Sequence, residues 1–247
     1  MSRRSWYLRG ASVTILAALT GWMTFDARGY ERLLRVLVPD QEVVLYPTRT
    51  MPVLMGQQLL LAGAASVLAL VAGAVLGLLA LSRVGRPFRD LIVSIGRLAQ
   101  MVPSVAIMAL VIPMTGYGAE PVIVALVLYS ILPIVLNIVS GIESVPPAVA
   151  DAATGVGMTR PQRLTRVEIP LALPVIMGGI KNMVVINVSA ATLGAVVAAG
   201  GLGMPILAGF AEYNEAFIVQ GALPSITLAL LLDRLLSPLP LTSPASR

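Results

Sequence analysis

The 247-residue chain contains no cysteine and no histidine, and only 12% of its residues are charged. Without cysteine it has no disulfide, no thiolate nucleophile and no cysteine-ligated metal. The absence of histidine removes the most common general base and the most common metal ligand. An average soluble domain has about 25% charged residues. Because 57% of the residues are hydrophobic, the sequence predicts an integral membrane protein.

Lysine is almost absent: of the 17 basic residues only Lys181 is a lysine, and an isoleucine precedes it. A phosphate-binding P-loop needs a Gly-Lys pair, so the chain has no such loop, and any ATP that drives it must be bound by another subunit. The formal charge of +5 comes from arginines that lie between apolar runs. That pattern is typical of residues that set membrane orientation rather than of a nucleic-acid interface.

Uncharged apolar runs predict an all-α, polytopic fold with about six transmembrane helices. A bilayer core of about 30 Å needs about 20 apolar residues per helix. The runs cover residues 10–25, 50–82, 98–119, 121–142, 182–211 and 216–232. A signal peptide is the alternative for the first run, since three arginines precede it. We favour a retained helix, because the residues at 22–25 offer no small-residue cleavage site.

The arginine clusters predict the orientation of the chain. Those at 3–9, 83–89 and 160–166 fall on one side of the membrane, which is expected to be the cytoplasm and to hold both termini. The outer segment 26–50 is expected to contain a short amphipathic helix. Its apolar residues at helical spacing are Tyr30, Leu33, Leu34 and Leu37.

A polar loop at 143–174 has the pattern of two short helices. Pro146 and Pro147 mark the start of the first helix. Gly155 and Gly157 are expected to end it and to permit a sharp turn. A compact helix–glycine–helix unit suits docking into another protein, and the alternative is an ordinary loop whose arginines contact lipid phosphates.

The second short helix has its own signals. Thr159 is predicted to be its N-cap, with Gln162 as the partner in a capping box. The helix is expected to run to about Glu168, where Pro170 would stop it.

Residues of this loop resemble the E-A-A-x-x-x-G-x(9)-I-x-L-P motif of binding-protein-dependent ABC importer permeases. The departures are Asp151 for Glu, Val167 for Ile and Ile169 for Leu. Outside the loop, the segments at 100–104, 128–134 and 200–203 resemble osmoprotectant permeases, which import glycine betaine, choline or carnitine. The resemblance covers roughly residues 59–236.

The resemblance implies a type I importer permease of the bacterial inner membrane, with a core similar to that of the methionine importer permease. Its partners would be ATPase subunits, a second permease subunit (identical or sibling) and a periplasmic or lipid-anchored substrate-binding protein. The implied ATPase-coupling residues are Asp151, Ala152, Ala153, Gly157, Ile169 and Pro170, with Arg160 and Arg163 as further ATPase contacts. Because the ATPase partner binds the ATP, we expect no catalytic residue, metal site or cofactor on this chain.

Three regions are expected along the chain. Residues 1–52 would form an N-terminal transmembrane helix and a periplasmic segment. Residues 53–237 would form the permease domain, with the coupling loop at 143–170. Residues 238–247 would form a cytoplasmic tail.

Uncharged polar side chains in the spans are the candidates for the translocation path, because a polar group that faces lipid is costly. For each of them the alternative is a hydrogen bond between helices. Aromatic residues make up only 5% of the chain, so an aromatic cage for a quaternary ammonium group is expected in the binding protein instead. The candidate path residues are Gln100, Asn137, Asn187, Ser189 and Thr192.

Other functions remain as alternatives. An ABC importer permease for an amino acid, a phosphonate or a sulfonate would have the same loop. A stand-alone secondary transporter is expected to show paired intramembrane charges or symmetric repeats, and the sequence shows neither. A membrane enzyme without histidine or cysteine would need a Ser–Lys or paired-Asp site, and Lys181 and Ser189 are poorly spaced for such a dyad.

Overall fold

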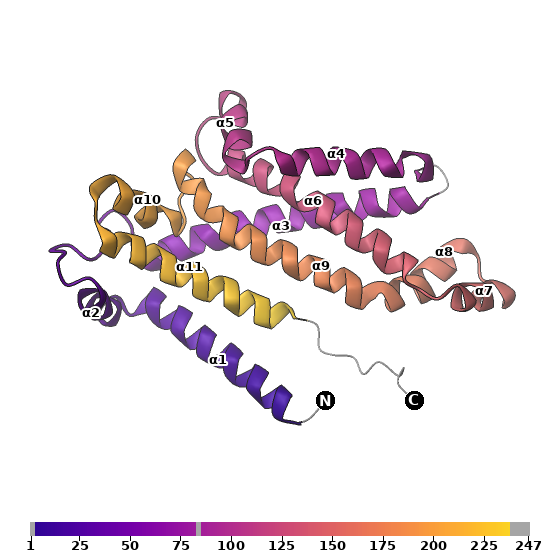
Figure 1. Ribbon diagram of the computed structural model, residues 1–247, viewed down its shortest axis with the longest axis horizontal. Helices are drawn as coiled ribbons and strands as arrows, with labels where there is room; N and C mark the ends of the chain where they lie inside the picture. The colour runs from indigo at the N-terminus through magenta and orange to yellow at the C-terminus, as the bar shows by residue number, and fades with distance from the viewer. Residues whose placement is uncertain (1–2, 83–84, 238–247) are drawn as a thin grey trace. The chain divides into compact units, whose positions relative to one another are not determined.

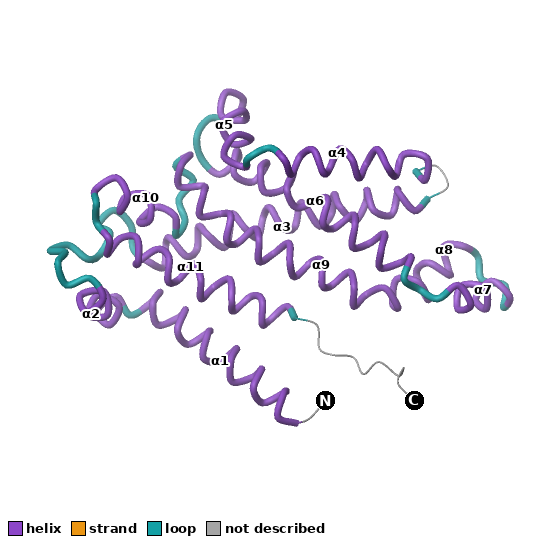
Figure 2. The backbone as a smooth tube through the Cα atoms, viewed as in Figure 1, coloured by secondary structure: helices purple, strands orange, loops and turns teal. Residues whose placement is uncertain are grey.

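The computed structural model describes residues 3–82 and 85–237 (Figure 1). Every regular element in these ranges is helical (Figure 2), which confirms the all-α prediction. The helices are α1 Arg3–Phe25, α2 Ala27–Leu37, α3 Met51–Leu81, α4 Arg89–Met101, α5 Ser104–Thr115, α6 Ala119–Glu143, α7 Pro147–Gly155, α8 Arg160–Arg163, α9 Ile169–Ala190, α10 Gly203–Glu212 and α11 Glu215–Leu236. Short 3-10 helices cover Arg86–Phe88 and Ala191–Val197, and a π-helical turn covers Leu164–Glu168. The predicted tail at 238–247 lies outside the described residues.

Four helical stretches in the described part of the chain are long and apolar enough to cross a membrane. They are α3, α6, the continuous stretch Arg160–Val197 that contains α9, and α11. Gly10–Phe25 of α1 and Ser104–Thr115 (α5) are apolar but shorter. The predicted runs at 10–25, 50–82, 121–142 and 216–232 therefore correspond to single helices.

The predicted span at 98–119 is wrong, because two helices share this run. α4 ends at Met101, and Pro103 takes an extended conformation (φ −55°, ψ 134°) before α5 begins at Ser104. A proline has no N–H to donate to a helix, and it drives the residue before it out of the helical region. Hydropathy alone does not register this break.

The predicted span at 182–211 is also wrong, and so is the expected stop at Pro170. One helix runs from Arg160 through Pro170 to the end of α9 at Ala190. The π-helical turn Leu164–Glu168 comes directly before Pro170, and there the Ile169 N–H donates to the Leu164 carbonyl. This wider turn accommodates the proline ring, which would otherwise clash with the carbonyl four residues earlier.

The helices form two compact units, which we describe separately. Among the described residues, the first contains 3–67, 102–127 and 184–235, and the second contains 68–82, 85–101, 128–183 and 236–237. The long helices α3, α6 and α9 each contribute to both units, because they continue through the division points.

In the first unit, α2 is the amphipathic helix that the sequence predicts. Tyr30 and Leu34 are fully buried. Asp26 caps the helix by accepting a hydrogen bond from the Gly29 N–H at 3.0 Å. That bond holds the pKa of the Asp26 carboxyl below its usual value.

The outer segment is held to the start of α11 by hydrogen bonds. The Tyr30 hydroxyl donates to the Gln220 carbonyl (3.0 Å), and the Gln220 side-chain oxygen accepts from the Tyr46 N–H (2.7 Å). Asn214 donates to the Val43 carbonyl at 2.8 Å. The segment after α2 is therefore an ordered part of this unit.

In the second unit, α3 and α6 pack at close range. A Cβ added at Gly73 would collide with Ile134, and one added at Gly77 would press on Ile138. Small residues permit this approach, as is common between membrane helices. Ala80, Val135 and Val139 form the buried cluster at this interface.

Candidate functional site

The loop after α6 forms a helix and a sharp turn. α7 begins at Pro147, as predicted, and ends at Gly155. The Met158 N–H then donates to the Ala153 carbonyl (3.1 Å), and the Gly157 N–H donates to the Thr154 carbonyl (3.0 Å). This pair of bonds is a Schellman motif, which needs a left-handed residue at the position of Gly157. Gly157 has a φ of +83°, a left-handed conformation that glycine adopts easily because it has no Cβ.

Most residues of α7 are exposed. Ala153 is buried, whereas Asp151 and Ala152 are exposed and Val156 is 76% exposed. No ion pair joins Asp151 to another residue in the described ranges. α7 therefore presents a surface of mostly small residues with one carboxylate and the apolar side chain of Val149, and the exposed Val156 follows it.

The second helix of the loop starts as the sequence predicts. The Thr159 N–H donates to the Gln162 side-chain oxygen at 2.9 Å, which is one half of a capping box. From there α8 continues through the π-helical turn into α9. Ile169 and Pro170 thus lie at the start of α9 rather than in a loop. A displacement of α8 is consequently passed directly to a long apolar helix.

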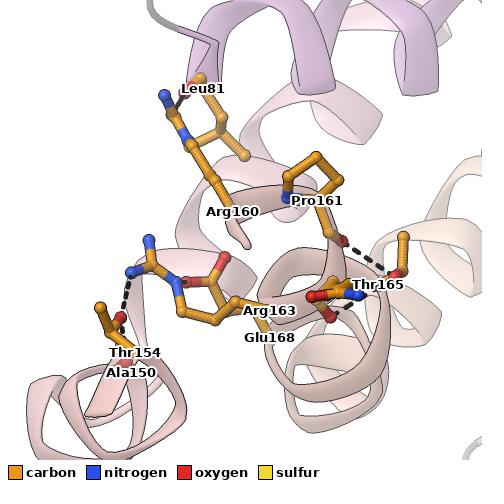
Figure 3. Close-up of polar contacts among 9 residues, drawn as sticks. Leu81, Ala150, Thr154, Arg160, Pro161, Arg163, Thr165 and Glu168 are labelled. Atoms are coloured by element: carbon orange, nitrogen blue, oxygen red, sulfur yellow. Dashed lines mark hydrogen bonds and ion pairs between the residues drawn. The ribbon is translucent and has the colours of Figure 1, made fainter. Parts of the chain in front are cut away.

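Arg163 clamps this helix to α7 (Figure 3). Its Nε donates to Glu168 Oε1 at 2.8 Å, and its Nη1 donates to Thr154 Oγ1 at 3.0 Å. The Thr154 hydroxyl donates onward to the Ala150 carbonyl (2.9 Å). The side chains of Arg163 and Glu168 are only 27% and 14% exposed. Because such charge-assisted bonds are stronger than neutral ones, the two helices of the loop are held as one body.

Arg160 joins the same loop to the end of α3. Its Nη2 donates to the Leu81 carbonyl at 2.6 Å (Figure 3). Between these elements lies a cavity of about 510 Å³, whose lining includes Leu78, Val145 and Leu164. Both arginines that were predicted to contact an ATPase are thus bonded within the chain. A further contact of either arginine with an ATPase stays a prediction.

Two hydrogen bonds hold α4 to the end of α6 in the same unit. Arg89 binds the Glu143 carboxylate through both terminal nitrogens, with an Nη2–Oε2 distance of 2.9 Å. This bidentate pair fixes the residue after which the polar loop begins. The loop is therefore connected to α3, α4, α6 and α9.

The sequence analysis missed Thr154 and Glu168 as parts of the clamp. Residues five apart do not face each other on an α-helix, and the Arg163–Glu168 pair forms across the π-helical turn. The one available signal was that Glu168 is the only acidic residue in the stretch 160–168, which contains three arginines.

The five candidate path residues are divided between the two units. Gln100 and Asn137 belong to the second unit, and the other three belong to the first. Gln100 donates to the Tyr129 carbonyl (3.0 Å), and Asn137 donates to the Pro133 carbonyl (2.7 Å). Their role in a path stays a prediction.

Asn187 forms a hydrogen bond between two helices, whereas the other two candidate path residues of the first unit, Ser189 and Thr192, bond to backbone close in sequence. The Asn187 side chain is fully buried, and its amide donates to the Ser66 hydroxyl at 3.0 Å. Ser189 is exposed and its hydroxyl donates to the Val185 carbonyl of its own helix at 3.0 Å. Thr192, at the start of the following 3-10 helix, is half-buried, and its hydroxyl donates to the Ser189 carbonyl at 2.7 Å. Ser189 and Thr192 thus remain reachable from outside the chain, whereas Asn187 does not.

The Asn187→Leu substitution is expected to lower stability rather than to act on transported solute. It removes a hydrogen bond between α9 and α3, and such bonds in membrane proteins contribute about 0.6–1.7 kcal/mol. The check is the midpoint of thermal unfolding in detergent, where the double variant Asn187→Leu/Ser66→Ala should recover part of the loss because no hydroxyl is left unpaired. Unchanged unfolding together with reduced uptake would return Asn187 to the path.

Comparisons with known proteins agree with this geometry. Residues 66–237 match a family described as the binding-protein-dependent transport system inner membrane component. An osmoprotectant import permease protein of Salmonella typhimurium, OsmW, is 44% identical over 140 residues, which cover 55% of this chain and 65% of the relative. The glycine betaine/carnitine/choline transport system permease protein OpuCB of Bacillus subtilis is 37% identical over 182 residues, 74% of this chain and 83% of the relative.

The fold has a counterpart among solved structures. A structure of the inward-facing MetNI methionine ABC transporter superposes with a TM-score of 0.62 at 23% identity. The superposition covers 73% of this chain and 91% of that one. At this identity the likeness establishes the fold, which is that of a type I importer permease, as predicted.

Proposed function

This chain belongs to the family of binding-protein-dependent transport system inner membrane components, and from this premise we propose that it moves a compatible solute inward across the bacterial inner membrane. The solute would be glycine betaine, choline or a related quaternary amine. The support is that the relatives named above are osmoprotectant and glycine betaine/carnitine/choline permeases at 44% and 37% identity.

The observation that carries the coupling part of the proposal is the rigid, exposed α7. An ATPase subunit needs a surface that it can grip and a body that transmits the movement. α7 offers the exposed Asp151 and Ala152, and the Arg163 clamp joins it to α9. Closure of an ATP-bound ATPase pair would therefore move α7 and the base of α9 together.

The proposed assembly follows from the division of labour. The chain supplies the path and the coupling loop, and a separate ATPase binds and hydrolyses ATP, so the chain itself uses no cofactor. A second permease copy or sibling would complete the path, and a periplasmic or lipid-anchored binding protein would deliver the solute. The arginine clusters support placing both termini and the coupling loop in the cytoplasm.

We also propose that residues 1–52 form an accessory region next to the permease domain 53–237. The family match begins only at residue 66. α1, α2 and the segment after them precede it, and both α2 and that segment are bonded to Gln220 of α11, through Tyr30 and Tyr46.

Uptake of radiolabelled glycine betaine at high osmolarity tests the proposed function. Cells that lack the chain are compared with the same cells after the chain is restored. Uptake that follows the gene and stops when ATP is depleted is the expected result. Equal uptake in both strains, with the chain present in the membrane together with its ATPase, would refute the proposed solute. Radiolabelled choline, carnitine and methionine in the same cells would then identify the class that is carried.

A further inference from the structure

In the first unit, the helical structure is interrupted between α9 and α10. After α9 the chain forms the 3-10 helix Ala191–Val197 and then turns through Ala198, Gly200 and Gly201, all at positive φ. Non-helical backbone is tolerated within a membrane only where protein or a water-filled cavity satisfies its polar groups. The hydrogen-bond partners of the segment 191–202 therefore show what holds its backbone in place.

Two adjacent glutamines of α3 provide those partners. The Gly201 N–H donates to Gln57 Oε1, and the Leu202 N–H donates to Gln58 Oε1, both at 3.0 Å. Gln58 Nε2 donates in turn to the Val188 carbonyl at 2.6 Å. Val188 is among the last four residues of α9, whose carbonyls have no partner within an α-helix. Gln58 thus bonds the chain on both sides of the break.

The glycines show how closely the glutamines approach the loop. A Cβ at Gly200 would overlap Gln57 Oε1, and one at Gly201 would overlap Gln58 Oε1. Both positions also have φ values that favour glycine, +87° and +83°. Gln58 is fully buried, whereas Gln57 is half-buried. A pair of amides in the largely apolar helix α3 is therefore fitted to this one loop.

We propose that Gln57 and Gln58 are positioning residues for transport, which fix the broken segment 191–202 so that it closes the outer end of the path. This rests on the proposed function, because it assigns the segment to the path. Leu193 and Val196 are 40% and 50% exposed on the held segment and would form the closing surface. Opening the path outward then requires these bonds to shift, so they set the balance between the closed and the outward-open states.

The test is ATP hydrolysis by the complete transporter in proteoliposomes without its binding protein. Gln57→Leu removes the acceptor for the Gly201 N–H, and Gln57→Glu keeps an acceptor oxygen there. One lost hydrogen bond is expected to shift the closed–open balance about fivefold, so binding-protein-independent hydrolysis by Gln57→Leu should rise by about that factor. Hydrolysis by Gln57→Glu should stay close to that of the unmodified chain.

A matched control is Gln41→Leu, in the same unit. It makes the same side-chain change but removes only a 3.4 Å bond to the Tyr213 carbonyl, away from the break, so its hydrolysis should be unchanged. Equal rates for the unmodified chain and Gln57→Leu, or equal rises for Leu and Glu, would overturn the proposal. If Gln57→Leu does not assemble with the ATPase, Gln57→Asn, which draws the carbonyl away from Gly201, takes its place with the same expected rise.

This readout is separate from the test of the proposed function. Hydrolysis is measured without any solute, so it decides the role of Gln57 even if the transported solute is not glycine betaine. Normal uptake by the unmodified chain with unaltered hydrolysis by Gln57→Leu would refute the positioning role alone.

Discussion

The Gly157→Leu substitution is expected to abolish ATP-driven uptake while the chain still inserts and folds. Gly157 holds the Schellman turn at a φ of +83°, and a non-glycine residue in that region costs about 1–2 kcal/mol. This cost alone corresponds to roughly a tenfold shift in an equilibrium. Apart from the two chain neighbours, no atom of the described residues lies within 4 Å of a Cβ at this position. The new side chain would therefore project from the exposed turn, which is the proposed contact with the ATPase.

The measurement is uptake of radiolabelled solute together with the amount of ATPase that co-purifies with the permease. Gly157→Asn is the first control, because asparagine tolerates a left-handed conformation, and it should keep more uptake than the leucine variant. Gly155→Ala is the second control, since Gly155 has open space and no positive φ. Normal uptake by Gly157→Leu would remove this turn from the coupling mechanism.

The Arg163→Met substitution is expected to uncouple ATP hydrolysis from transport. It breaks both the link to Thr154 and the ion pair with Glu168, whose carboxylate is only 14% exposed. The loss of such a charged hydrogen bond costs about 1.5–3 kcal/mol. α7 would then move without carrying α9, so solute transported per ATP should fall several-fold in proteoliposomes.

A double variant separates coupling from stability. Arg163→Met/Glu168→Met leaves no buried charge unpaired, so it should recover most of the thermal stability. Coupling should stay impaired, because the link from residue 163 to Thr154 is still missing. Arg166→Met is the matched control: Arg166 is exposed and makes no ion pair among the described residues. A double variant with full coupling would show that Arg163 serves stability only.

The loop that we propose to couple to the ATPase was predictable because its signals are local. Pro147 at a helix start and Gly157 at a left-handed turn act through their own backbone preferences. The Thr159–Gln162 capping box likewise depends on four consecutive residues. Each of these features therefore appears in the structure where the sequence places it.

The wrong predictions all concern the continuity of helices. Apolar runs report hydropathy only. Both 98–119 and 182–211 are apolar, although the α-helix is interrupted at Pro103 and at 191–202. Conversely, Pro170 does not end a helix, because the π-helical turn before it makes room for the ring. Such a turn depends on packing beyond the local sequence.

The partners of individual side chains were the least predictable part of the site. Asn187 is a polar residue in an apolar span, as a path residue would be, but Ser66, far away in the sequence, accepts its hydrogen bond. Gln57 and Gln58 are equally polar within an apolar run, and only the three-dimensional position of Gly201 and Leu202 explains them. Contacts between residues distant in sequence are absent from any local pattern.

The most direct measurement is solute accumulation in proteoliposomes that contain this chain, its ATPase and its binding protein. We expect radiolabelled glycine betaine to accumulate above its equilibrium level only when ATP and both partners are present. We also expect Gly157→Leu to remove this accumulation while the complex stays assembled. Accumulation by the chain alone under a sodium or proton gradient would refute ATP-driven import and would identify a secondary transporter instead.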